Sequence, residues 1–304
     1  MSMQFKQATK KQLKLRLALA GPSGSGKTYS ALAIASGLGE RIAVIDTEHG
    51  SASLYADRFK FDTLTLGSFA PSTYVEAIHA AESAGYEVIV IDSLSHAWMG
   101  KDGALEQVDA AAKRNKGNSY VAWRDVTPQH NALVDAMVQC KAHLVGTMRS
   151  KMAYEIGDEN GKKSVKKLGM APIQREGLEY EFTVFGDVDL DHNLVITKTR
   201  CSELAGKVIT KPGAPLAKTL RAWLDSGEAQ AEKPSAPPAK PADHSALLAS
   251  IQKAPSLEAL AETQAAITAL PPADQKPLRD GYAARKKWLT DEASKSEPAK
   301  KGAA

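Results

Sequence analysis

Residues 21–28 read Gly21-Pro22-Ser23-Gly24-Ser25-Gly26-Lys27-Thr28. They satisfy the pattern GxxxxGK[ST] and lie between an apolar run typical of a buried strand, residues 15–20, and a helical pattern at residues 29–38. Glycines let the backbone N–H groups of such a loop surround a phosphate, while Lys27 reaches the outer phosphates and the Thr28 hydroxyl ligates Mg²⁺. All eight residues are therefore predicted to bind ATP, with Mg²⁺ beside Thr28.

The composition is that of a globular protein without a membrane segment. Hydrophobic residues make up 43% of the 304 residues, charged residues make up 24%, and the formal net charge is only +4. The total charge therefore does not indicate a nucleic-acid-binding protein, and any basic surface must be local. Cys140 and Cys201 have no metal-binding spacing and are expected to be free thiols. Because no signal-peptide pattern or long apolar run is present, we expect a cytoplasmic protein with no membrane partner.

Short apolar runs alternate with helical patterns from residue 15 to about residue 199. The runs are LRLALA, RIAVID, FDTLTL, EVIVID and AHLVGTMR, and helical patterns lie near residues 72–84, 104–114 and 122–140. This alternation predicts a doubly wound α/β domain with a mostly parallel sheet. Residues 180–200 favour a hairpin that turns at Asp191-His192-Asn193, which would give the sheet an antiparallel C-terminal edge.

Shifts in composition divide the chain into five parts. They are a polar leader (1–14), the α/β ATPase domain (15–226), a Pro/Ala/Lys-rich linker (227–244), a small helical module (245–290) and a tail expected to be disordered (291–304). Within the module, a cap at Ser256, a break at Pro271-Pro272 and an end near Trp288-Leu289 define three helices.

Val88-Ile89-Val90-Ile91-Asp92 is an apolar strand that ends in a carboxylate, which is the form of a Walker B element. In that role Asp92 belongs to the Mg²⁺ site, accepting hydrogen bonds from metal-bound water. A carboxylate that caps a helix would give the same local pattern. Asp92 is followed by Ser93, so the adjacent glutamate that activates water in most AAA+ motors is missing. The base for hydrolysis must then come from elsewhere in the chain.

Ile45-Asp46-Thr47-Glu48-His49-Gly50 ends the second predicted strand, and Leu54-Tyr55-Ala56 follows it. With the IDS of residues 91–93, these motifs resemble the RecA-like recombinase family over roughly residues 15–225. The resemblance implies a RecA-like P-loop ATPase core in which Glu48 is the catalytic base and Tyr55 stacks on adenine. A carboxylate at the carboxyl edge of an open sheet can also face the phosphate loop. The alternatives are a surface position for Glu48 and a packed helical position for Tyr55.

The chain departs from that family at two places. Thr147 stands where the family carries a Gln that senses the γ-phosphate, so ATP and DNA are expected to be coupled differently. The family's N-terminal oligomerisation helix is missing from the leader, which instead contains Phe5-Lys6-Gln7-Ala8. This FxxA sequence resembles the tether by which some recombinases add a strand to the neighbouring subunit. A Phe packed on its own domain is the alternative.

Ile196-Thr197-Lys198-Thr199-Arg200 resembles the family segment in which two cations reach the γ-phosphate of the neighbouring subunit. The resemblance gives Lys198 and Arg200, together with Lys27 and Glu48, catalytic roles. Alternate residues of a strand share a face, as that role across an interface requires. An exposed strand edge protected by cations has the same pattern.

Residues 150–176 follow the strand after the Walker B element, at the place where the family contacts DNA. The residues expected to bind single-stranded DNA are Lys151, Tyr154, Lys162, Lys163, Lys166, Lys167 and Arg175. The cations would contact phosphates and Tyr154 would stack on a base. Four acidic residues dilute this charge, so a solvated β-hairpin turning at Asn160-Gly161 is the alternative, and a hairpin can also carry the basic face.

In overall plan the chain is most similar to phage and prophage RecA-like ATPases associated with single-strand annealing and recombination. That resemblance implies a single-stranded-DNA-binding protein that hydrolyses ATP to ADP and phosphate between the subunits of a homo-oligomer, either a filament or a ring. It would work in the cytoplasm of a bacterial host, and its helical module would contact other recombination or replication proteins. The alternative is a nucleotide-gated adaptor, similar to a helicase loader, whose ATP turnover is incidental. Stimulation of turnover by single-stranded DNA separates the two.

Overall fold

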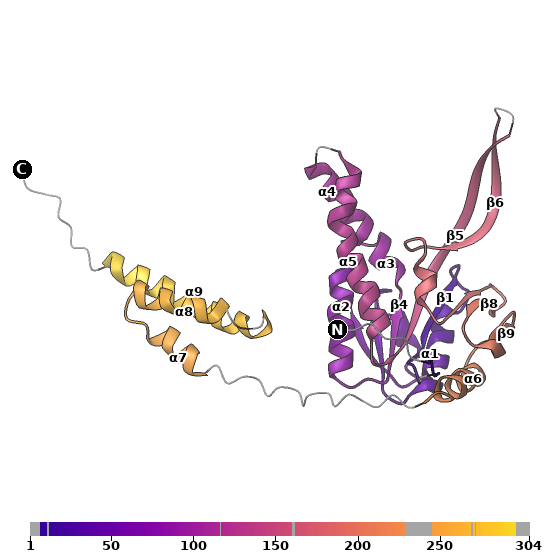
Figure 1. The fold of residues 1–304 in the computed structure, drawn as a ribbon, viewed down its shortest axis with the longest axis horizontal. Helices are drawn as coiled ribbons and strands as arrows, with labels where there is room; N and C mark the ends of the chain where they lie inside the picture. The colour runs from indigo at the N-terminus through magenta and orange to yellow at the C-terminus, as the bar shows by residue number, and fades with distance from the viewer. Residues whose placement is uncertain are drawn as a thin grey trace, which may run out of the picture. The chain divides into compact units, whose positions relative to one another are not determined.

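The computed structural model describes residues 7–10, 12–115, 117–159, 162–228, 245–268, 270 and 272–295 (Figure 1). The chain divides into two compact units, residues 1–230 and residues 231–304. The strands, all in the first unit, are β1 (Arg16–Gly21), β2 (Ile42–Asp46), β3 (Asp62–Thr65), β4 (Val88–Asp92), β5 (His143–Glu159), β6 (Lys162–Pro172), β7 (Val184–Val188), β8 (Asn193–Thr199) and β9 (Val208–Thr210). Its α-helices are α1 (Lys27–Leu38), α2 (Pro71–Ser83), α3 (Ser95–Met99), α4 (Ala104–Arg114), α5 (Ser119–Gln139) and α6 (Ala214–Asp225).

The strands form one sheet in the order β3-β2-β4-β5-β1-β7-β8-β9, with β6 paired to β5 outside this path. Pairing is parallel from β3 to β7 and antiparallel between β7, β8 and β9. The predicted mixed α/β architecture with a mostly parallel sheet is therefore confirmed, including the hairpin that turns near His192, where φ is 63°. The phosphate loop, Glu48 and Asp92 all stand at the ends of inner strands, which are β1, β2 and β4.

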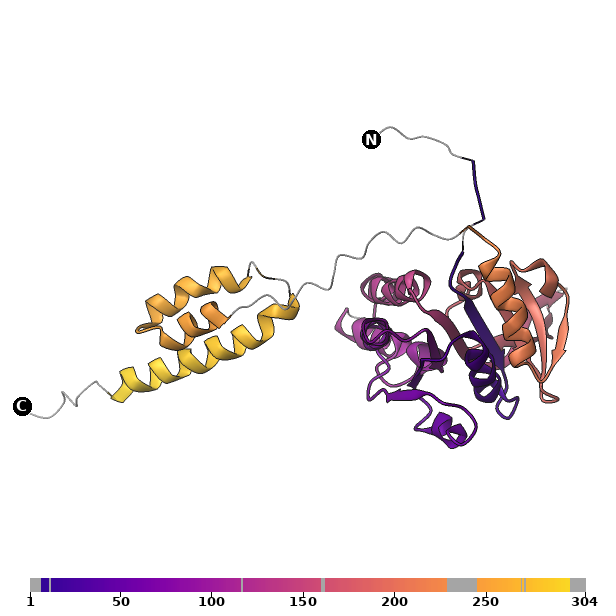
Figure 2. The ribbon, with the colours of Figure 1, turned by 90° about the horizontal axis from the view of Figure 1, so that it is seen from below.

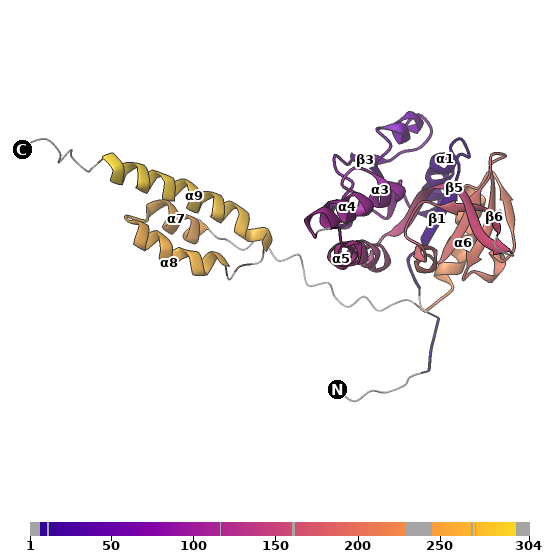
Figure 3. The same ribbon diagram turned by 90° about the horizontal axis from the view of Figure 1, so that it is seen from above.

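Helices cover both faces of the sheet, as the alternation of β1 side chains requires (Figure 2, Figure 3). Leu17 and Leu19 pack into a core with α1 and α6, whereas Ala18 and Ala20 face a second core with α2 and α5. Every residue of β1, β2 and β4 is buried, which is usual for parallel strands that have helices on both sides. Cys140 and Cys201 are buried free thiols, as predicted.

The strand predicted to end at Arg149 does not end there. β5 continues to Glu159, and its outer part pairs antiparallel with β6 in a register that runs from Ser150 opposite Pro172 to Glu159 opposite Lys162. The two strands project as a long ribbon from the body of the unit (Figure 1). The predicted turn at Asn160-Gly161 lies outside the described residues. The backbone of the described part of residues 150–176 therefore forms the β-hairpin that the sequence analysis gave as the alternative.

The described part of the leader lies against the end of the same unit. Residues Lys10 and Gln12 exchange backbone hydrogen bonds with Glu228, at 2.8 and 3.0 Å. Lys10 Nζ also donates to the carbonyl oxygen of Trp223 at 2.7 Å. The FxxA residue Phe5 lies outside the described residues, so its expected role as a tether stays a prediction.

The second unit contains three helices in its described residues, α7 (Ser245–Lys253), α8 (Leu257–Thr268) and α9 (Pro272–Lys295). Their core includes Ile251, Leu260 and Leu278. The Ser256 hydroxyl accepts a hydrogen bond from the N–H of Ala259 at 3.2 Å, which is the expected cap. α9 runs beyond the predicted end near Trp288-Leu289 and into the segment predicted to be disordered from residue 291. Among the described helices, none is long and apolar enough to cross a membrane.

Candidate nucleotide site

The phosphate loop has the backbone conformation that its glycines permit. Gly24 and Gly26 have φ angles of 81° and 84°, which L side chains rarely adopt. The loop leads directly into α1, whose first residue is Lys27, so the helix N-terminus lies at the loop. Lys27 Nζ donates to the carbonyl oxygen of Pro22 at 2.7 Å, within its own loop. Burial lowers the pKa of Lys27, the Arg149 cation lowers it further, and the Asp92 and Glu48 carboxylates oppose both effects.

A cavity of about 1190 Å³ opens beside this loop. Its walls include loop residues from Ser23 to Thr28, the carboxylates of Glu48 and Asp92, and residues 211–215 at the start of α6. The volume is slightly above the range of about 300–1,000 Å³ that is usual for ligand and cofactor pockets, so the cavity has room for a nucleoside triphosphate. Five of the predicted loop residues thus share one cavity with the predicted base and the predicted Walker B carboxylate, whereas Gly21, Pro22 and Ser25 do not line it.

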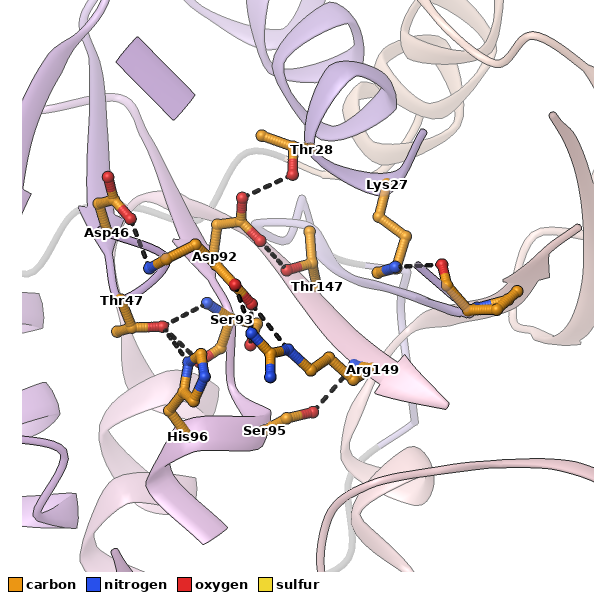
Figure 4. Close-up of polar contacts among 12 residues, drawn as sticks. Lys27, Thr28, Asp46, Thr47, Asp92, Ser93, Ser95, His96, Thr147 and Arg149 are labelled. Atoms are coloured by element: carbon orange, nitrogen blue, oxygen red, sulfur yellow. Dashed lines mark hydrogen bonds and ion pairs between the residues drawn. The ribbon is translucent and has the colours of Figure 1, made fainter. Parts of the chain in front are cut away.

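Asp92 lies at the end of β4 with both carboxylate oxygens held by hydroxyl groups (Figure 4). Thr28 Oγ1 donates to Oδ2 at 2.7 Å, and Thr147 Oγ1 donates to Oδ1. Burial raises the pKa of Asp92 above its ordinary value, although both hydrogen bonds act in the opposite direction. A buried carboxylate whose charge is penalised by burial is a site that a cation would stabilise.

The oxygens of Thr28 and Asp92 fit Mg²⁺, which prefers hard oxygen ligands and usually takes one or two protein groups together with phosphate and water. Within the described residues, no group of three or more His, Cys, Asp or Glu side chains is arranged to hold a metal ion. The chemistry of the cavity therefore suits Mg²⁺ that arrives with a nucleotide. Thr147 lies on the neighbouring strand β5, and the sequence alone did not predict the contact of its hydroxyl with Asp92.

Glu48 follows β2, and its backbone N–H donates to Asp46 Oδ1 at 2.7 Å. Arg149 Nε donates to Glu48 Oε1 at 2.9 Å, and Arg149 Nη2 pairs with Oε2. Ser93 Oγ donates to Oε1 at 3.3 Å. Burial by itself would raise the pKa of Glu48, but the hydrogen bonds and charge of Arg149 outweigh it and hold the pKa below its ordinary value. Glu48 is therefore a cavity carboxylate, not a residue of an unrelated surface loop.

A small polar network fixes the loops beside Glu48 (Figure 4). The Thr47 hydroxyl oxygen accepts the N–H of Ser93 at 2.7 Å and lies 2.7 Å from Nδ1 of His96. Ser95 Oγ accepts the backbone N–H of Arg149 at 2.9 Å. The ends of β2, β4 and β5 are thereby linked to one another. Neighbouring parallel strands end at the same sheet edge, which is why residues distant in sequence meet here.

Tyr55 closes a short 3-10 helix, residues Ser51–Tyr55, and lines the cavity. Its ring also contacts the ring of Tyr29 edge-on, with centroids 5.6 Å apart, and Tyr29 meets Phe59 in the same way at 5.2 Å. Tyr55 is therefore packed against another aromatic residue, which was the alternative in the sequence analysis, and it also lines the cavity, as stacking on adenine requires. An aromatic wall at this point suits the predicted stacking on adenine.

His192 and Lys211 also line the cavity and were missed by the sequence analysis. His192 Nδ1 lies 3.0 Å from the carbonyl oxygen of Ser25, so the β7–β8 turn braces the phosphate loop. The backbone N–H of Lys211 donates to the carbonyl oxygen of His192 at 2.8 Å. Both residues have positive φ angles, 63° and 48°. No local motif marks them, because the contact of His192 with the phosphate loop depends on how β7 pairs with β1.

The remaining predicted site residues lie outside the cavity. Lys198 Nζ donates to the carbonyl oxygens of Glu179, Tyr180 and Phe182 of its own chain, the first at 3.0 Å. Arg200 is exposed and lies one residue beyond the end of β8. Lys198 and Arg200 are therefore not two residues of one strand, as the sequence analysis expected.

The predicted DNA-binding residues belong to the hairpin and its base. Lys151 is exposed, and Arg175 Nη1 donates to Asn131 Oδ1 at 3.4 Å. The other five, whose side chains lie outside the described part of the structure, occupy the hairpin strands: Tyr154, Lys162, Lys163, Lys166 and Lys167.

Comparison with known proteins gives one family. No curated protein matches the chain. The sequence profile of the family described as "AAA domain" matches residues 13–209, which span the phosphate loop, Asp92, Glu48 and the hairpin. This range covers more than half of the chain and nearly all of the sheet. The chain therefore belongs to the AAA domain family, a family of P-loop nucleotide-binding ATPase domains.

Proposed function

We propose that this protein is a RecA-like, Mg²⁺-dependent ATPase that binds single-stranded DNA in homologous recombination or strand annealing of the phage type. The observation that carries the proposal is the position of the hairpin base. Ser150 on β5 and Ile173 directly after β6 both line the nucleotide cavity, so both strands of the hairpin start at its wall. A ligand held on the hairpin would thus act on the edge of the ATP site through two covalent connections.

The residue types on the hairpin support a polyanionic ligand. Residues 150–176 contain six basic and four acidic residues. The register sets Glu155 opposite Lys166 and Asp158 opposite Lys163, so acidic and basic positions face each other across the strands. The excess of positive charge is modest, and a moderate rather than steep salt dependence of DNA binding follows.

The base of the hairpin is also tied to the loop after β4. Gln174 Nε2 donates to the carbonyl oxygen of Leu94 at 2.9 Å, and its Oε1 lies 3.2 Å from Nε2 of His130 on α5. Leu94 directly follows the segment that carries Asp92 and Ser93. These contacts support coupling between the hairpin and hydrolysis.

For hydrolysis, the proposal assigns one task to each cavity residue. Lys27 and the loop N–H groups bind the phosphates, and Thr28 and Asp92 hold Mg²⁺, whose charge offsets that of the phosphates. Glu48 orients the attacking water and takes up its proton. Tyr55 provides the face on which adenine stacks. In AAA+ motors the base follows the Walker B Asp, whereas here Ser93 follows Asp92. The proposed base, Glu48, instead follows the neighbouring strand β2.

Replacing Lys162, Lys163, Lys166 and Lys167 with Ala should weaken single-stranded-DNA binding and flatten its salt dependence. Each lost phosphate contact removes about 0.7 from the slope of log affinity against log salt concentration. Fluorescence anisotropy at several salt concentrations measures both quantities. The matched control replaces four exposed lysines elsewhere in the unit, Lys14, Lys60, Lys141 and Lys218. Equal losses in both variants would mean that the hairpin is not the DNA site.

Assembly into a homo-oligomer is supported by the free edge of the sheet. β3 is the terminal strand, all four of its residues are exposed, and a cavity of about 150 Å³ lies between it and α2. Small residues, Ala77, Ala80 and Ala81, line that cavity. An added strand with one inserted aromatic ring suits such an edge. We propose that Phe5 of one subunit occupies the cavity of the next, and that Arg200 reaches toward the neighbour's γ-phosphate.

The Phe5→Ala variant should sediment as smaller species than the wild-type protein in the presence of ATP and Mg²⁺, because the strand loses its anchoring side chain. Sedimentation velocity gives the mass distribution. The Lys6→Ala variant is the control, since its neighbouring side chain would point away from the cavity on an added strand. An unchanged distribution for Phe5→Ala would remove the leader from the interface.

The adaptor alternative is favoured by one observation, the second compact unit with its own core. A separately folded helical unit is suited to binding a partner protein. In that case nucleotide would set an assembly state, and single-stranded DNA would leave the rate of turnover unchanged.

A further inference from the structure

Both oxygens of the Glu48 carboxylate accept hydrogen bonds. Arg149 binds both of its oxygens in a two-point contact, and Ser93 Oγ donates to one of them. Two-point guanidinium–carboxylate contacts are among the stronger charge-assisted hydrogen bonds. These three donors occupy most of the acceptor sites of the carboxylate, so they compete with a water molecule for the same oxygens. Its proton affinity is also reduced, since Arg149 holds the pKa of Glu48 below its ordinary value.

Arg149 is placed to exchange this partner for a phosphate. It lines the same cavity as Lys27 and Thr28. Within the described residues, no hydrogen bond is formed by its Nη1. The backbone of Arg149 is fixed by the bond from its N–H to Ser95 Oγ and by pairing of β5 with β1. Only the side chain needs to move.

The strength of the pair suits a reversible contact. The side chains of Arg149 and Glu48 keep 49% and 24% of their surface accessible, so solvent screens their attraction. Ion pairs of that exposure change an equilibrium constant by about fivefold or less. A γ-phosphate carries more negative charge than one carboxylate and also accepts two N–H groups of a guanidinium. A nucleoside triphosphate can therefore compete for Arg149, whereas a diphosphate lacks the competing group.

We propose that Arg149 is a lock on Glu48 that the γ-phosphate opens: the phosphate draws the guanidinium away, and the freed carboxylate then faces the water. This inference rests on the proposed function, since it takes the cavity as an ATP site and Glu48 as its base. It adds a positioning role for a residue that the sequence motifs did not single out. It also explains how a chain with Thr147, bound to Asp92, in place of the family's Gln can still distinguish ATP from ADP.

The lock predicts a thermodynamic coupling between Glu48, Arg149 and the γ-phosphate. In Glu48→Gln the ion pair is lost, so a triphosphate no longer has to break it. Binding of the non-hydrolysable triphosphate AMP-PNP should become about two- to fivefold tighter, which corresponds to an ion pair of this exposure. Binding of ADP should stay nearly constant. The tightening should disappear when Arg149→Ala is already present.

Calorimetric titration of the wild-type protein, both single variants and the double variant with Mg²⁺ and each nucleotide measures this cycle. Glu48→Gln also removes a negative charge near the phosphates, but that effect is the same with or without Arg149. Equal tightening in both backgrounds would therefore overturn the lock. Retained ADP binding shows that each variant is folded, and Arg149→Lys, which keeps the charge but loses the two-point contact, should restore only part of the coupling.

The cycle uses equilibrium binding, so it can be read even if the protein does not turn over ATP. Binding without turnover would count against the proposed catalytic function. The measured coupling alone would then decide whether the lock exists. If the wild-type protein bound neither nucleotide, both the ATP site and the lock would be wrong.

Discussion

Glu48→Gln is expected to lower the turnover number for ATP hydrolysis by about 100- to 10,000-fold, the usual contribution of a general base. The amide keeps the shape of the side chain but cannot take a proton from water. Nucleotide binding should survive, because the phosphate loop, Thr28 and Asp92 are unchanged. Phosphate release measured at saturating ATP gives the rate, and calorimetry gives the affinity.

The control for this variant is Glu76→Gln, the same change on the exposed face of α2 and away from the cavity. It should hydrolyse ATP at the wild-type rate. Wild-type turnover in Glu48→Gln as well would assign the base to another group and would leave the lock on Glu48 without a catalytic purpose.

Lys27→Ala is expected to weaken ATP binding by about 30-fold or more, since removing one partner of a desolvated charge pair costs about 2 to 5 kcal/mol. Lys27 belongs to both the loop and the first turn of α1, which places it next to the backbone N–H groups that would bind the phosphates. Calorimetric titration with ATP and Mg²⁺ gives the change in affinity.

Lys60→Ala, an exposed lysine outside the cavity, controls for the loss of one positive charge. It should bind ATP as tightly as the wild-type protein. If Lys27→Ala did so too, residues 21–28 would not be a phosphate-binding loop despite their geometry.

The parts of the site that could be predicted from the sequence are local in the chain. The phosphate loop is eight consecutive residues between a strand and a helix, and Asp92 ends an apolar strand, so periodicity and motif place both. Glu48 required the resemblance to a family, because a carboxylate after a strand has many uses. The structure adds that it shares the cavity with the loop.

The contacts of Arg149, Thr147 and His192 could not be predicted, because they depend on strand order. Arg149 was the expected end of its strand. It lies beside Glu48 because β2 and β5 pair in parallel with the two sides of β4. His192 meets the phosphate loop because β7 pairs with β1. Sequence periodicity indicates strands but not which strands are neighbours.

Two boundaries were misjudged for a different reason. The outer part of β5 belongs to a segment rich in charged residues and glycine, and its strand conformation comes from pairing with β6. α9 extends to Lys295 through charged residues, which favour a helix without showing any apolar periodicity. Polar segments of this kind carry a weak signal for their own ends.

The most direct measurement is the rate of ATP hydrolysis by the wild-type protein with Mg²⁺, in the presence and absence of single-stranded DNA. We expect turnover that requires Mg²⁺ and rises when single-stranded DNA is added, because the hairpin that would hold the DNA starts at the wall of the nucleotide cavity. The same rise should be absent in the variant that lacks the four hairpin lysines. Turnover that single-stranded DNA leaves unchanged would contradict a DNA-dependent ATPase and favour the nucleotide-gated adaptor.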